Sequence, residues 1–111
     1  MSDGQLVTAT YRVALERQAD FLELMRTCER VMLDEGLITR RPFIRMRSKV
    51  DPTILIEIFE WLDATSFGKA QQNASVLEMW RNYEAAWLEG GFGLDQVPEA
   101  SQPWAQFDPV D

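Results

Sequence analysis

Five aromatic residues with polar edges are the first candidates for a binding site. They are spread over the chain: Tyr11, Trp61, Trp80, Tyr83 and Trp87. If the fold brings them together, their rings could line a cleft for a flat organic ligand, and their phenol and indole groups could orient it through hydrogen bonds. The alternative is that the rings only fill the hydrophobic core. The residue types alone leave both interpretations open.

A second group of candidates combines polar, charged and aromatic side chains on predicted strands. Its members are Thr8, Thr10, Arg12, Arg45, Arg47, Glu57 and Phe59. Either Arg45 or Arg47 could bind a ligand carboxylate through two parallel hydrogen bonds. We favour a structural role, in which an Arg12–Glu57 ion pair sets the register between two packed sheets. The arginines over residues 42–49 would then protect a sheet edge from aggregation.

Several chemistries are excluded by residue types that the sequence lacks. It has no histidine and a single cysteine, Cys28. An internal disulfide, a Cys-rich zinc site, a Ser-His or Cys-His nucleophile and a histidine-ligated haem are therefore not expected. We expect neither a metal nor a cofactor. Cys28 lies on an apolar helical stripe and is expected in the core. Glu57 and Glu60 point to opposite faces of one strand and cannot act as a catalytic pair.

The overall composition predicts one soluble domain, residues 1–111. Apolar residues make up 46% of the chain and charged residues 26%, as in ordinary globular domains. The formal net charge of −7 disfavours nucleic acids and anionic membranes as partners, because both require a basic surface. No apolar run approaches the roughly 20 residues that span a bilayer, and the N-terminus does not resemble a signal peptide. A cytoplasmic location is expected.

The first half of the chain predicts a strand, a helix and a strand pair. Alternating apolar residues predict a strand over residues 6–15, and an apolar stripe predicts a helix over residues 18–35 that ends at Gly36. The stripe consists of Phe21, Leu24, Met25, Cys28, Val31 and Met32. Residues 42–49 and 53–61 predict two strands. The strand over residues 53–61 is the most apolar segment and is therefore expected at the centre of the sheet.

The second half of the chain predicts two helices. Asp63 is expected to be the N-cap of a short helix. Ser75 and Glu78 match a capping box, in which each side chain binds a free backbone N–H at the start of a longer helix. Gly90 and Gly91 are expected to end this helix. Its aromatic-rich stripe consists of Val76, Met79, Trp80, Tyr83 and Trp87.

This order of elements predicts an α+β fold, the ferredoxin-like split βαβ sandwich. We expect a four-stranded antiparallel sheet with helices on one face, and the first and third strands as central neighbours. The core elements cover about residues 6–89. Residues 92–111 are expected to form a loop-rich tail that could include a short last strand at residues 104–107.

The central strand presents a packing problem, because both of its faces are apolar. The two sets of side chains are Ile54, Ile56 and Ile58, and Leu55, Glu57, Phe59 and Trp61. If the isoleucines pack under the helices, the other set has no cover within the chain, and monomers rarely expose such a patch. Pairing two sheets would bury about 800 Å² on each partner. We therefore expect a homodimer, a dimeric α+β barrel. Its dimer-face candidates are Arg12, Leu55, Glu57 and Phe59.

One segment carries a resemblance to a known family. Residues 57–80, EIFEWLDATSFGKAQQNASVLEMW, run from a strand ending in Trp through an acidic turn into a helix and a second, capped helix. Over about residues 6–89 the chain resembles the dimeric α+β barrel proteins related to antibiotic-biosynthesis monooxygenases. The resemblance implies a fold rather than one activity. The family includes cofactor-free oxygenases of aromatic polyketides, haem-degrading enzymes and members without an assigned activity.

The haem-degrading branch of that family uses an Asn on the first strand, a Trp ending the third strand and a His on a later helix. Trp61 matches the tryptophan. Tyr11 stands at or beside the asparagine position, and Trp80 falls near the histidine position. Haem degradation by that route is therefore not expected. The asparagine usual in the cofactor-free oxygenases is missing as well.

Three functions remain open. The first is a non-catalytic homodimer that binds a small aromatic or apolar molecule, or that serves a partner protein; its pocket residues would be Tyr11, Trp61, Trp80 and Tyr83. The second is a cofactor-independent monooxygenase acting on a phenolic substrate, although no residue stands out as its general base. The third is a structural oligomerisation module. Binding is the principal expectation, and no catalytic residue is assigned.

Overall fold

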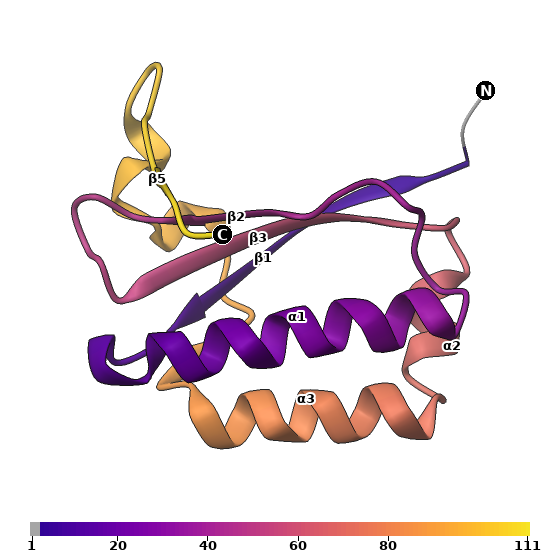
Figure 1. Ribbon diagram of the computed structural model, residues 1–111. Helices are drawn as coiled ribbons and strands as arrows, with labels where there is room; N and C mark the ends of the chain where they lie inside the picture. The colour runs from indigo at the N-terminus through magenta and orange to yellow at the C-terminus, as the bar shows by residue number, and fades with distance from the viewer. Residues whose placement is uncertain (1–2) are drawn as a thin grey trace.

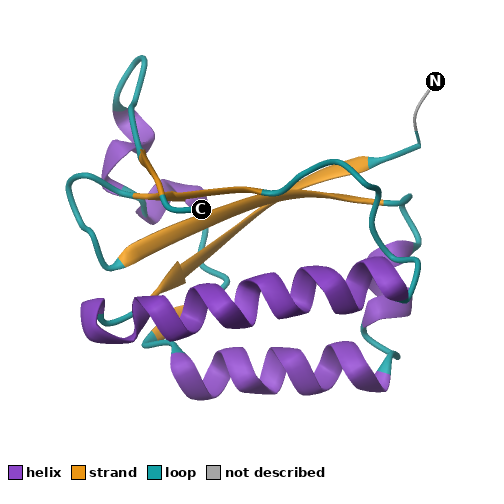
Figure 2. Cartoon of the chain, viewed as in Figure 1, coloured by secondary structure: helices purple, strands orange, loops and turns teal. Residues whose placement is uncertain are grey.

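A five-stranded antiparallel sheet and two long helices form the two layers of the computed structural model, which describes residues 3–111 (Figures 1 and 2). The strands are β1 (Gln5–Arg12), β2 (Ile44–Arg47), β3 (Ile54–Trp61), β4 (Glu89–Gly90) and β5 (Asp108–Pro109). The helices are α1 (Gln18–Asp34), α2 (Ser66–Ala70) and α3 (Ala74–Ala86). The strand order is β4-β1-β3-β2-β5. The α+β class and the central β1–β3 pair are as predicted.

The expected four-stranded sheet is wrong, because two short strands extend both edges. After α3 the chain pairs with β1 through β4, where the Leu88 N–H donates to the Arg12 carbonyl and the Gly91 N–H to the Thr10 carbonyl. At the other edge β5 pairs with β2. The last strand therefore lies just after the predicted residues 104–107.

None of the helices within residues 3–111 is both long and apolar enough to cross a membrane.

Some predicted boundaries need correction. β1 ends at Arg12 rather than at residue 15, because residues 15–17 form a 3-10 turn that leads into α1. α1 closely matches its predicted range, and Gly36 adopts a φ of +71° just beyond it. β2 is shorter than residues 42–49.

The predicted helix caps are also wrong. Asn73, not Ser75, is the N-cap of α3, and its side chain accepts a hydrogen bond from the Val76 N–H. Asp63 accepts from Thr65 in a turn that precedes α2, and Thr65 holds the N-cap position. α3 ends at Ala86, before the two glycines that were expected to end it.

The predicted orientation of the central strand is wrong. Leu55, Phe59 and Trp61 pack beneath the helices in the main hydrophobic core, together with Phe21 and Met25 of α1. Glu57 lies on the same face by the alternation of the strand. Of the dimer-face candidates, Leu55, Glu57 and Phe59 are therefore covered by helices of their own chain.

The opposite face of the sheet is covered in part by the tail, which lies on the side of the sheet away from the helices (Figure 1). Ile54 and Ile56 are buried there with Val97 in a second, smaller core. Glu99 fixes the tail, because its carboxylate accepts hydrogen bonds from the Ser48 hydroxyl at 2.7 Å and from the Lys49 N–H at 2.8 Å. The tail therefore covers the isoleucine face, which was expected to lie beneath the helices.

Candidate functional site

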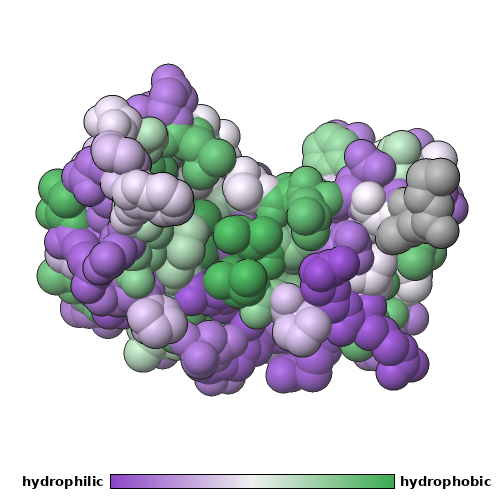
Figure 3. Space-filling model, turned by 90° about the horizontal axis from the view of Figure 1, so that it is seen from above, coloured by the Kyte–Doolittle hydropathy of each residue, from purple (hydrophilic) through white to green (hydrophobic). Residues whose placement is uncertain are grey.

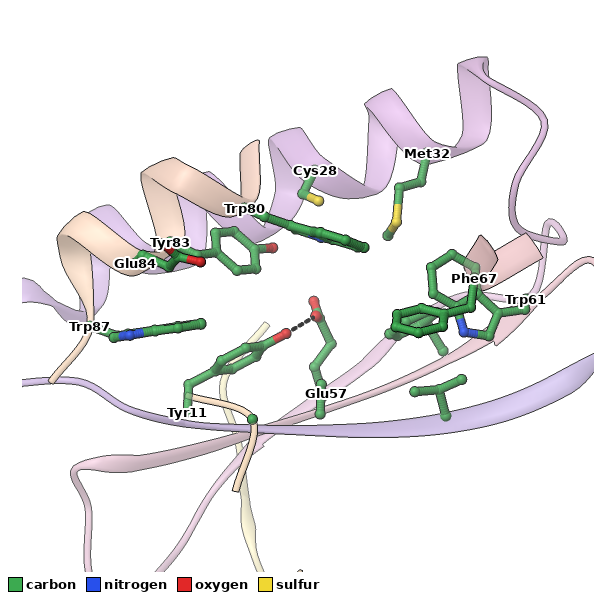
Figure 4. A pocket seen from close by; sticks show the side chains of 14 residues that line it. Tyr11, Cys28, Met32, Glu57, Trp61, Phe67, Trp80, Tyr83, Glu84 and Trp87 are labelled. Carbon is green, nitrogen blue, oxygen red and sulfur yellow. Dashed lines mark hydrogen bonds between the residues drawn. The ribbon is translucent and has the colours of Figure 1, made fainter. Parts of the chain in front are cut away.

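A cavity of about 330 Å³ lies between the sheet and the helices (Figure 4). The four predicted pocket residues, Tyr11, Trp61, Trp80 and Tyr83, all line it, and so does Trp87. The other lining residues are Val7, Ala9, Cys28, Met32, Glu57, Phe59, Phe67, Glu84 and Gly91. The fold therefore brings the aromatic candidates together around one space.

Helical and strand periodicity explain why these side chains converge. Tyr11 and Glu57 stand on the face of β1 and β3 that is turned toward the helices (Figure 4). Trp80 and Tyr83 are three residues apart on α3, so both point from one helical face toward the sheet. Cys28 and its neighbours along the buried stripe of α1 close the far side.

Aromatic contacts hold the walls of the cavity in place. Trp87 stacks on Tyr11 with ring centroids 5.7 Å apart, and Tyr83 meets Tyr11 edge-on at 5.6 Å. At the other end, Phe67 of α2 lies between Trp61 and Trp80, with centroid distances of 6.2 and 6.3 Å. Such packed pairs restrict the rings, so the cavity has defined walls.

Glu57 is the polar group at the base of the cavity. The residue is almost fully buried, at 2% exposure. The Tyr11 hydroxyl donates to one carboxylate oxygen at 3.2 Å, and Nε of Arg45 donates to the other at 3.0 Å. Burial raises the pKa of Glu57 to about 7, and the Arg45 charge offsets this only in part. The site therefore holds a carboxyl group that gains and loses a proton near neutral pH.

Arg45 serves three carboxylates at once. Besides Glu57, it pairs with Glu29 of α1 at 2.6 Å and with the Asp111 side chain at 2.5 Å. Arg26 pairs with Asp111 as well, at 2.7 Å. The predicted Arg12–Glu57 pair is absent, because Arg12 lies on the other face of the sheet and pairs with Asp51. Arg45 is therefore the buried counter-ion of Glu57.

The two phenols and the thiol of the cavity stay protonated at neutral pH. Burial raises the pKa of the Tyr11 and Tyr83 hydroxyls above 10, and the Glu57 charge adds to this effect. Burial raises the pKa of the Cys28 thiol to about 11. Cys28 is thus a buried thiol, as the apolar stripe predicts, and a weak nucleophile at neutral pH.

The other predicted polar candidates lie outside the cavity. Arg47 donates to the Gln18 side chain at 3.0 Å. Thr8 and Thr10 face the opposite side of the sheet, where the Thr10 hydroxyl donates to the Phe92 carbonyl. Within residues 3–111, no three His, Cys, Asp or Glu side chains are grouped as metal ligands.

Sequence reasoning missed two features of this site. It named Glu57 but placed it on a dimer face, and it gave no role to Phe67 or Glu84. Glu57 could have been placed from its strand position, because it shares a face with Phe59 and Trp61. Glu84 lies four residues after Trp80, on the same side of α3.

Comparisons with known proteins show the fold alone. The sequence matches no family model and no curated protein. A solved structure of "a conserved protein from Methanosarcina mazei Go1" is similar, with a TM-score of 0.62, 21% identity, and coverage of 78% of this chain and 83% of that one. A Nitrosomonas europaea protein described as a "putative antibiotic biosynthesis monooxygenase" is also similar. Its TM-score is 0.63 at 16% identity, with coverage of 87% of this chain and 96% of that one.

These likenesses agree with the architecture described above. The chain has a ferredoxin-like α+β fold of the type found in antibiotic biosynthesis monooxygenases. The fold resemblance stated from the sequence is therefore confirmed. At sequence identities of 16–21%, the structural similarity to these two proteins assigns no activity to this chain.

Proposed function

We propose that this protein binds a small aromatic or apolar molecule in the cavity between its sheet and its helices. The observation that carries the proposal is the cavity itself, about 330 Å³ of space walled by aromatic rings around one buried carboxyl group. Ligand sites typically have volumes of about 300–1,000 Å³, mostly apolar linings and few polar groups. A module with only a structural role would have no need for this space.

Filling the cavity tests the proposal. Ala9 lines the cavity from β1, so the larger side chain of Ala9→Leu should occupy part of the space. The variant should therefore bind indole and naphthalene more weakly than the unmodified protein does. Tryptophan fluorescence and calorimetry measure this binding. Trp104→Phe is the matched control, because Trp104 is 95% exposed and does not line the cavity. The proposal fails if the unmodified protein binds no aromatic compound, or if a well-folded Ala9→Leu variant binds as tightly.

We also propose that the protein acts as a homodimer, on a basis different from the one first expected. The tail leaves part of the outer sheet face open, where Leu6 is 66% and Ile44 56% exposed, and apolar atoms gather in the middle of this face (Figure 3). Ile58 of β3 lies on the same outer face, between Thr8 of β1 and Ile44 of β2. Light scattering should give twice the chain mass for the protein and less for Ile44→Asp. A lone protomer at micromolar concentration would refute this part.

A second candidate function, cofactor-free oxygenation of a phenolic substrate, gains support from Glu57. Such chemistry needs a base that forms the phenolate, and a carboxyl group with a pKa of about 7 in the cavity is suited to that step. Oxygen uptake with simple hydroquinones is the test. An uptake rate that is unchanged by Trp61→Phe and Tyr83→Phe would remove the candidate. We rank it second, because no Lys or Arg is among the described residues that line the cavity, where such a side chain could stabilise a phenolate.

A further inference from the structure

The ionisable side chains that line the cavity are all acids. They are Tyr11, Cys28, Glu57, Tyr83 and Glu84, and no Lys or Arg is among the lining residues described here. The two phenols and the thiol are neutral at ordinary pH, as shown above. The charges that a ligand meets are therefore those of Glu57 at the base and of Glu84, which is exposed at the surface of α3.

The arginines near Glu57 are fewer than the carboxylates that pair with them. Arg45 and Arg26 pair with Glu23, Glu29, Glu57 and Asp111, so two guanidinium groups stand against four carboxylates. Burial denies Glu57 the water that would otherwise compensate its charge. With Glu57 ionised, this network has a negative charge in excess, and Glu57 is its member that lines the cavity.

The remaining walls of the cavity are suited to a cation. The rings of Trp80, Trp87 and Tyr11 border the space, and the faces of aromatic rings attract ammonium groups. The formal net charge of −7 also raises the local concentration of cations around the protein. Both features disfavour anionic ligands.

We infer that the ligand of this cavity is an organic cation, a protonated amine on a flat or apolar body, whose charge lies against the Glu57 carboxylate and the neighbouring aromatic rings. The inference rests on the proposed binding function and narrows its ligand class. An uncharged hydroxyl could donate a hydrogen bond to Glu57 but would leave the excess charge in place. A ligand carboxylate would add to the excess.

Three probes that share a phenyl ring and a three-carbon chain, and that differ in the terminal polar group, test the inference. They are 3-phenylpropylamine, 3-phenyl-1-propanol and 3-phenylpropionate, compared by calorimetry at pH 8, where Glu57 is ionised. We expect the amine to bind at least about tenfold more tightly than the alcohol, and the carboxylate to bind most weakly. Equal or tighter binding of the alcohol would overturn the cation inference and leave the proposed binding function intact. If no probe and no other aromatic compound binds, both fail.

Variants show whether Glu57 is responsible. Glu57→Gln should remove most of the amine preference and leave the alcohol affinity nearly unchanged. Glu60→Gln is the matched control, because Glu60 lies on the same strand outside the cavity and pairs with Thr39 and Arg41. An amine preference that survives Glu57→Gln would overturn the assignment.

The pH dependence of the unmodified protein gives an independent readout that needs no variant. Lowering the pH from 8 to 5.5 protonates Glu57 and should weaken the amine severalfold but not the alcohol. The groups that face Glu57 are Tyr11, Arg45, Cys28 and Tyr83, with Glu29 behind Arg45. The raised pKa values of the tyrosines and the cysteine keep them neutral over this range, and Arg45 stays charged. An amine affinity that does not change with pH would contradict the inference.

Discussion

Glu57 should make the fold less stable as the pH rises from 5 to 8. Its pKa is about 7 in the folded chain and 4.5 as the ordinary value that the unfolded chain should show. Between these values the folded state keeps a proton that the unfolded state has lost, so raising the pH favours unfolding. At about 1.4 kcal/mol for each pH unit, the gap corresponds to roughly 3 kcal/mol.

The pH window for this effect holds few competing groups. The chain has no histidine, which would otherwise titrate there. The carboxyl groups with lowered pKa values have the opposite effect, because their stabilisation is lost only as the pH falls through those lower values. They are Asp51, Glu60, Asp63, Glu99 and Asp111. Between pH 5 and 8 the stability of the protein should therefore follow Glu57.

Urea unfolding at constant ionic strength, repeated from pH 5 to pH 8, measures the effect directly. The free energy of unfolding should fall by about 3 kcal/mol in the unmodified protein and stay nearly level in Glu57→Gln. Glu60→Gln should keep the fall. A stability that is level or rises over this range, or a fall that persists in Glu57→Gln, would refute the reasoning.

Other contacts make separate predictions. Arg45→Met removes the cation that three carboxylates share and should lower the free energy of unfolding at pH 8 by about 3–5 kcal/mol in urea; a stability equal to that of the unmodified protein would contradict the shared pairing. Asn73→Ala should cost about 1 kcal/mol, whereas Ser75→Ala should change stability by less than about 0.5; the reverse order would favour the capping box. Gly90→Ala would place a Cβ on the Trp87 ring, so near-ultraviolet circular dichroism should change and aromatic ligands should bind more weakly. An unchanged spectrum and unchanged ligand affinity would contradict the close packing of Gly90 against the Trp87 ring.

The elements and their pairing could be predicted from periodicity. The apolar stripe of α1 and the alternation in β1 and β3 each match one regular structure, and their order allows few topologies. The caps were harder, because Asn73 and Ser75 are both good N-cap residues two positions apart. Which one is used depends on where the preceding turn ends.

The orientation of the sheet could not be predicted, because β3 is apolar on both faces. Alternation separates Ile54 and Ile56 from Phe59 and Trp61, but it does not say which set meets the helices. The tail that covers the isoleucines has no periodicity, and its apolar residues are widely spaced. The position of Glu57 depends on this orientation. Because the predicted orientation of β3 was wrong, Glu57 was placed on a dimer face instead of in the cavity.

Arg45 links parts of the molecule that are distant in sequence. Through it, the end of the tail at Asp111 and the middle of α1 at Glu29 contribute to the potential at the base of the cavity. If Asp111 separates from the sheet edge, Arg45 has one carboxylate fewer to share its charge with, and more of that charge is available to Glu57. Separation of Asp111 from Arg45 would thus change the acidity of Glu57 without any movement of the cavity walls.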